Sequence, residues 1–148
     1  MSTGEPARAL LASAAAWLDQ GRRVDRLSRL LTVTALLALV AIAVLGAPKL
    51  MVVALLGLSV LAGAAELYLA VRVGFDAALF RRLAEAGTLE LANLDAALTT
   101  MGLLPAGKAG RPLEARVAGA CSLLYQQAGS LLLQIALFLL GAVMAALS

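Results

Sequence analysis

The stretch LMVVALLGLSVLAGAAELYLAV, residues 50–71, is apolar except for one charged residue, Glu66. A helix that spans a bilayer needs about 20 predominantly apolar residues. Two other stretches have this character, residues 30–47 and residues 128–147. The whole chain is 62% hydrophobic and 14% charged, against about 45–50% and 25% in ordinary soluble domains. The sequence therefore predicts an all-α membrane protein with three transmembrane helices.

These apolar runs divide the chain into four segments. The first two runs are separated by little more than Gly46, Pro48 and Lys49. Since proline cannot continue a helix interior, the two runs are expected to form an antiparallel hairpin. We expect an amphipathic, basic N-terminal segment at residues 1–29, the transmembrane hairpin at 30–71, a cytoplasmic helical segment at 72–127, and the third transmembrane helix with the C-terminus at 128–148.

Lysine and arginine are distributed unevenly about these runs. Of the 12 basic residues, only Lys49 lies between the first and second runs. The others precede the first run or lie between the second and third, and an excess of lysine and arginine marks cytoplasmic loops. The N-terminus is thus predicted in the cytoplasm and the C-terminus outside it. The abundance of arginine over lysine, with much alanine and leucine, indicates a bacterial protein and hence the inner membrane.

The N-terminal segment has a helical apolar stripe made of Leu10, Leu11, Ala14, Trp17 and Leu18. Two positions are open for this helix: it lies in the lipid headgroups, or it packs on the protein's own cytoplasmic part. The candidates for headgroup contact are Trp17, Arg22, Arg23, Arg26 and Arg29.

The segment at residues 72–127 is expected to contain amphipathic helices. The second spanning helix is predicted to continue to Gly87, and Thr88 is expected to cap a shorter helix that ends at Gly102. Pro112 is expected to begin a last helix that runs into the third span. The apolar stripes of these helices supply the candidate residues for binding a partner, namely Phe80, Leu83, Leu91, Leu94, Leu98 and Met101.

Polar residues recur at one depth of the predicted spans. Glu66 lies roughly 9 Å inside Arg72 by helical rise, and Gln134, Thr32 and Thr34 fall at similar depths. An acid within a membrane is by default a candidate for a proton, cation or substrate path. The alternative, which we favour, is that Glu66 bonds to Gln134 or a threonine and holds the bundle together. A third possibility is an ion pair with Arg29 or with a basic residue of a partner subunit.

Small residues on the second run favour close helix packing. Ser59 and Gly63 form a pair of small residues four positions apart, which lets helices approach closely. We expect this face to pack within the chain.

The residues for catalysis or metal binding are scarce. The chain has no histidine and one cysteine, Cys121, and it contains no phosphate-binding loop. We therefore expect no enzyme, no cofactor and no metal site, and the few aromatic residues do not suggest nucleic-acid binding.

The sequence predicts a small accessory or scaffold subunit that binds a larger inner-membrane complex. The alternative is a self-assembling pore or small transporter with Glu66 and Gln134 on its path. The expected partners are the bilayer and either an integral membrane protein or further copies of the chain.

Overall fold

The computed structural model describes residues 4–45, 49–86, 91–103 and 110–147, and within these ranges the chain is helical apart from short turns. The helices are α1 (Gly4–Leu18), α2 (Gly21–Leu45), α3 (Leu50–Glu85), α4 (Leu91–Thr100) and α5 (Leu113–Ala146). Three helical stretches, Glu5–Leu45, Leu50–Glu85 and Leu113–Ala146, are long and apolar enough to cross a membrane, and each overlaps one of the three predicted runs. The all-helical fold class with three candidate spans is therefore confirmed. The expected turn at Gly46 and Pro48 and the expected cap at Thr88 lie outside the described residues.

Helices α3 and α5 are much longer than a bilayer is thick. They contain 36 and 34 residues, which correspond to lengths of about 54 Å and 51 Å, whereas the hydrocarbon core is about 30 Å thick. Each helix is therefore long enough to cross the apolar layer and to continue well beyond it. These lengths leave room for the extension out of the membrane that we predict for the second and third spans.

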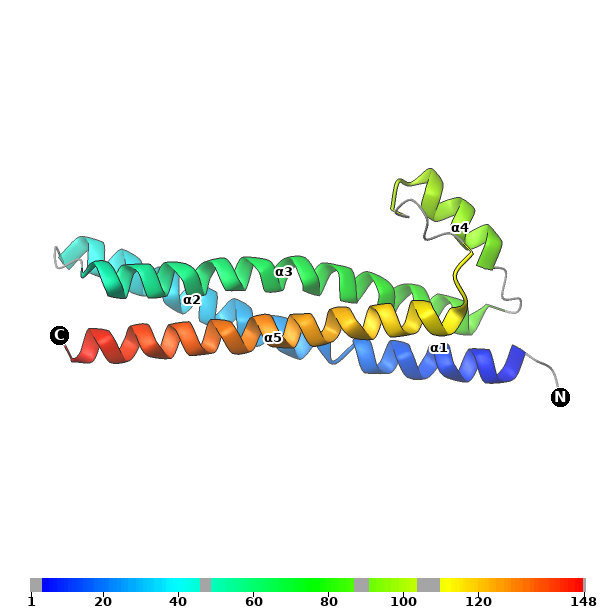
Figure 1. Cartoon of the computed structure of the whole chain (residues 1–148), viewed down its shortest axis with the longest axis horizontal. Coiled ribbons are helices and arrows are strands. Elements are labelled where there is room, and N and C mark those ends of the chain that lie inside the picture. Colours follow the sequence, from blue (N-terminus) through cyan, green and yellow to red (C-terminus); the bar gives the residue numbers. More distant parts are fainter. Residues whose placement is uncertain (1–3, 46–48, 87–90, 104–109, 148) are drawn as a thin grey trace.

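The helices form one elongated bundle, in which α3 contacts α1, α2 and α5 (Figure 1). The last turn of α2, the first turn of α3 and the last turn of α5 lie at one end, which we call the hairpin end. The first turn of α1 and the whole of α4 lie at the other, which we call the basic end (Figure 1). Helix α1 continues the line of α2 after a short turn and packs beside α3 and α5.

Buried positions recur every seven residues along each of the three long helices. A seven-residue repeat is typical of helices that interlock as in a left-handed coiled coil. The repeat consists of Gly21, Ser28 and Ala35 on α2; Val52, Ser59, Glu66, Val73 and Phe80 on α3; and Leu113, Ala120, Gln127, Gln134 and Gly141 on α5. In the middle of the bundle, two consecutive positions of the repeat on α3 and on α5 are polar. Apolar residues or glycine occupy the positions on either side of them.

The apolar stripe of helix α1 packs against α3 and α5 of the same chain. Leu11 and Leu18 are fully buried and share a core cluster with Val73, Phe80 and Leu124. We considered that this helix lies in the lipid headgroups or packs on the protein itself, and in the structure it packs on the protein. Trp17 is 50% exposed, so its predicted place in the buried stripe is corrected: at about 100° per residue it lies beside the stripe.

Candidate functional site

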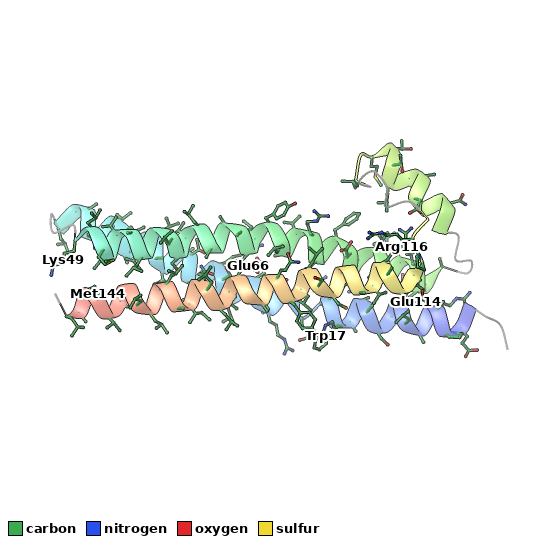
Figure 2. All side chains as sticks on the ribbon, viewed as in Figure 1. Trp17, Lys49, Glu66, Glu114, Arg116 and Met144 are labelled. Carbon is green, nitrogen blue, oxygen red and sulfur yellow. The ribbon has the colours of Figure 1, made fainter. Side chains whose placement is uncertain are left out.

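Polar side chains from α2, α3 and α5 meet in the bundle interior, and we call this set the polar core. Its members are Ser28, Thr32, Ser59, Glu66, Gln127 and Gln134. All but the partly buried Thr32 are buried, and Ser59, Glu66 and both glutamines are fully so. The label of Glu66 in Figure 2 marks the position of this core near the middle of the bundle.

Gln134 connects α5 to α2 and α3 through hydrogen bonds. The Ser28 hydroxyl donates to Gln134 Oε1 at 2.6 Å. Gln134 Nε2 donates to the Ser28 carbonyl at 3.1 Å and to Thr32 Oγ1 at 2.8 Å. The Ser59 hydroxyl donates to the backbone carbonyl of Gln134 at 3.2 Å. Both polar atoms of the Gln134 side chain are thus hydrogen-bonded, as a buried amide requires.

Glu66 belongs to the next layer toward the basic end and bonds to Gln127. Gln127 Nε2 donates to Glu66 Oε1 at 2.6 Å and to the Gly21 carbonyl at 3.0 Å. Two buried acceptors of this layer, Glu66 Oε2 and Gln127 Oε1, have no hydrogen-bond donor among the described residues. This layer is therefore less completely satisfied than the layer around Gln134.

Two glycines make room for the glutamines. A Cβ atom on Gly63 would lie 2.2 Å from Thr32 Oγ1 and 2.7 Å from Gln134 Nε2, and one on Gly21 would lie 2.7 Å from Gln127 Oε1. Real side chains do not approach so closely, so each layer depends on the absence of a side chain at its glycine. The expectation that Gly63 packs helices together within the chain is confirmed.

The structure brings together three of the four residues predicted for the polar layer. Glu66, Gln134 and Thr32 lie in the polar core, although Glu66 bonds to Gln127 and not to Gln134. Thr34 is exposed, and its hydroxyl donates to the Leu30 carbonyl of its own helix at 2.9 Å. Its assignment to the layer was wrong, because two residues along a helix turn the side chain by about 200° at nearly the same depth.

The ion pair considered between Glu66 and Arg29 is also corrected. Arg29 Nε donates to Asp25 Oδ1 at 2.8 Å, one turn away on the same helix. Arg29 is exposed and Asp25 is partly buried, whereas Glu66 is fully buried. The guanidinium of Arg29 therefore pairs with Asp25 and not with Glu66.

Sequence reasoning missed Gln127, Ser28 and Gly21. Gln127 was assigned to the end of the cytoplasmic segment, and Ser28 lies within a basic stretch where hydropathy gives no inward signal. The signal that identifies them is the seven-residue spacing, because Gln127 precedes Gln134 by seven residues and Ser59 precedes Glu66 by seven.

A second feature is a groove of about 760 Å³ near the basic end, between α3, α4 and α5. Its lining is mainly apolar, with Phe75, Leu79 and Leu123 among the contributors. The charged residues in the lining are Arg72, Asp76, Arg111 and Arg116. Helix α4 stands away from the side of the bundle above this region (Figure 1).

Helix α4 is attached to α5 by a polar clamp. Arg116 Nη2 donates to both carboxylate oxygens of Asp95, at 2.7 Å and 2.8 Å, and the Gly110 backbone N–H donates to Asp95 Oδ2 at 2.8 Å. The Gly110 hydrogen bond and the Arg116 guanidinium hold the pKa of the Asp95 carboxyl below its usual value of 3.8. Gly110 has a φ of 72°, a backbone conformation that favours glycine, so the clamp depends on this residue type.

The predicted partner-binding residues are divided between the core and the surface. Phe80 and Leu98 are buried, with exposed fractions of 4% and 7%, and both line the floor of the groove. Leu83 is partly buried against the core, whereas Met101 is 59% exposed. The expectation of a free surface is corrected for Phe80 and Leu98, because their helices pack on other parts of the same chain. The side chains of Leu91 and Leu94 lie outside the described residues.

The candidates for headgroup contact lie on the bundle exterior. Trp17 is half exposed, and Arg22, Arg23, Arg26 and Arg29 are all exposed. Arg22 also lies 3.5 Å from Asp19, whose carboxylate bonds to Arg81 of α3. The structure thus places these residues together around the junction of α1 and α2.

Comparison with known protein families, curated proteins and solved structures finds no match to this chain. Among the described residues, no group of three or more acidic, histidine or cysteine side chains could hold a metal ion. The polar core and the groove are therefore the two features from which a function can be inferred.

Proposed function

We propose that the chain is a small accessory or scaffold subunit that binds a larger complex in the bacterial inner membrane. In this proposal the basic end lies in the cytoplasm, and the hairpin end and C-terminus lie outside it. The distribution of lysine and arginine supports this orientation, since only Lys49 lies at the hairpin.

The observation that carries the proposal is the way α4 is presented. This helix has only 10 residues, and isolated helices of that length are marginal in water. It nevertheless stands away from the side of the bundle and is joined to α5 by the Asp95–Arg116 clamp (Figure 1). Met101 at its end is 59% exposed. A supported helix with an exposed apolar end is suited to contact with another protein.

The polar core gives a second argument for a scaffold. Gln134, Ser28, Thr32 and Ser59 bond to one another across α2, α3 and α5. Hydrogen bonds between membrane helices contribute about 0.6–2 kcal/mol each, and buried polar residues in a seven-residue repeat fix helix register. These contacts support a bundle that is complete within one chain and acts through its surface.

Native mass spectrometry on protein extracted gently from its own membranes tests the proposal. We expect a foreign integral membrane subunit at a fixed ratio. Met101→Asp should weaken its retention at least tenfold, because it places a charge in an apolar contact. Thr100→Asp adds the same charge at an exposed neighbouring position without removing apolar surface, and should retain the subunit. Equal retention by both variants would exclude Met101 as an anchor.

A pore or small transporter is the second candidate, and one observation favours it. Glu66 Oε2 and Gln127 Oε1 are buried acceptors without a donor among the described residues, and buried polar groups of this kind occur on ion and proton paths. A homo-oligomer of defined size with no foreign subunit in the same spectrum would favour this candidate over the scaffold.

A further inference from the structure

We propose that the groove between α3, α4 and α5 binds one anionic phospholipid from the adjoining leaflet. Its phosphodiester would lie against Arg72 and Arg111, and its chains would extend toward the membrane past Tyr68 and Val71. This site is separate from the exposed arginines near Trp17, none of which lines the groove.

The position of the groove along α3 supports a lipid ligand. A span that begins next to Lys49 uses about 20 residues and so ends close to Tyr68. Tyrosine and arginine are the residues typically found at the level of the headgroups. Tyr68 and Arg72 fit this pattern, since Arg72 Nη1 donates to the Tyr68 hydroxyl at 3.1 Å and the guanidinium carbon lies 6.0 Å from the ring centroid. From Tyr68 to Phe80 the groove follows α3 for about 18 Å. It therefore begins where the bilayer ends.

The charges in the groove leave one positive charge in excess. The side chain of Arg116 is occupied by Asp95. Arg72, Arg111 and Asp76 remain, and none of them takes part in an ion pair within 4.0 Å among the described residues. Two cations and one carboxylate give a net charge of +1, which complements the single negative charge of a phosphodiester. Basic pockets beside transmembrane helices are a recurrent form of lipid headgroup site.

The apolar lining suits the part of a lipid nearest its headgroup. Phe75 is 44% exposed and Val71 is 66% exposed on the same side of α3. The volume of about 760 Å³ lies within the usual range for small-molecule sites. Gly119 of α5 also lines the groove, and a Cβ atom there would meet nothing within 4 Å, so this wall is open.

The test is a titration of the purified full-length protein with dioleoyl phosphatidylglycerol, followed by native mass spectrometry. We expect one phosphatidylglycerol to bind in preference to dioleoyl phosphatidylcholine. The double variant Arg72→Gln/Arg111→Gln should weaken this binding roughly thirtyfold, because each base near a phosphate contributes about fivefold. Asp76→Asn should have the opposite effect and strengthen it, since it removes the only carboxylate in the lining.

Two further variants separate a defined site from general surface charge. Arg22→Gln/Arg23→Gln removes the same charge at the junction of α1 and α2, outside the groove lining, and should leave the affinity unchanged. Gly119→Phe keeps every charge but fills the groove, and it should abolish the preference for phosphatidylglycerol. Equal loss in the two arginine pairs, or unchanged binding in Gly119→Phe, would overturn the proposal.

Photocrosslinking in native membranes identifies the occupant directly. A p-benzoylphenylalanine introduced at position 79, in the groove wall, should produce adducts with the mass of a phospholipid. An adduct with a foreign polypeptide or with a second copy of the chain would instead assign the groove to protein docking and refute the lipid site.

Discussion

At the residue scale, the polar core depends on two small residues as much as on its glutamines. Gly63 lies directly against Thr32 and Gln134, and Gly21 lies against Gln127. An amide side chain in an apolar interior must have its hydrogen bonds, since an unsatisfied buried group costs about 1–3 kcal/mol. The glycines allow the helices to come close enough for those bonds to form. Glycine at these positions is therefore part of the polar site.

Replacing Gly63 with alanine tests this dependence. The new Cβ atom would lie 2.2 Å from Thr32 Oγ1, so either the hydrogen bond between Thr32 and Gln134 or the helix spacing must change. Overpacking of this kind costs about 1–3 kcal/mol. We expect Gly63→Ala to lower the free energy of unfolding by that amount, measured by circular dichroism during denaturant titration in detergent.

The matched control is Gly57→Ala on the same helix, where a Cβ atom would meet nothing within 4 Å. Alanine is the better helix former, so this variant should be neutral or slightly more stable. Equal destabilisation by both substitutions would show that helix flexibility, and not the polar core, requires glycine in α3.

At the scale of single elements, α4 depends on its clamp. Its short length gives it little stability of its own, and Asp95 is joined both to Arg116 of α5 and to the backbone of Gly110. Charge-assisted hydrogen bonds are about twice as strong as neutral ones. The position of α4 therefore rests largely on a single ionised carboxylate.

The protonation of Asp95 predicts how α4 responds to pH. The pKa of this carboxyl is below its usual value of 3.8 in the folded chain. A lowered pKa gives a stabilisation that is fully present above the unfolded value and is lost as the pH falls through the folded value. We expect the hydrogen-exchange protection of α4, corrected for intrinsic rates, to be constant from about pH 5 to pH 8. Asp95→Asn should lower that protection throughout this range.

Asp25→Asn is the control for the pH experiment, because Asp25 forms an exposed pair with Arg29 within α2. It removes the same charge without touching the clamp and should leave the exchange of α4 unchanged. Protection of α4 in the unmodified chain that declines between pH 8 and pH 5 would contradict the assignment of Asp95 as the ionised partner.

At the scale of the whole molecule, hydropathy was sufficient to predict three spans but not their internal contacts. Long apolar runs require helices in lipid whatever their neighbours are, so residues 50–71 could be assigned without any tertiary information. The polar core instead depends on which helix face is inward. Depth in the membrane was the basis for predicting Thr34 in the same layer as Thr32, although the two side chains point in different directions. The seven-residue repeat contains that directional information, and it also marks Gln127.

The lipid proposal and the partner proposal both depend on how the bundle is oriented in the membrane. The groove and the α4 clamp lie at the basic end, the exposed arginines near Trp17 lie around the junction of α1 and α2, and Lys49 is the only basic residue at the hairpin. Cationic segments are retained on the cytoplasmic side, and there they meet the anionic lipids that the groove would bind. The lipid proposal and the partner proposal therefore both require the basic end to be cytoplasmic.

Cysteine labelling measures this orientation, since Cys121 is the only natural cysteine. In a Cys121→Ser background, Lys49→Cys should react with a membrane-impermeant maleimide in intact spheroplasts. Glu5→Cys, an exposed position on α1 at the other end, should react only after the membrane is permeabilised. The reverse pattern would place α4 and the groove outside the cell, and labelling of both positions in intact spheroplasts would show a mixed topology. Either result would contradict the cytoplasmic functions proposed for the basic end. It would leave the description of the bundle and its polar core unchanged.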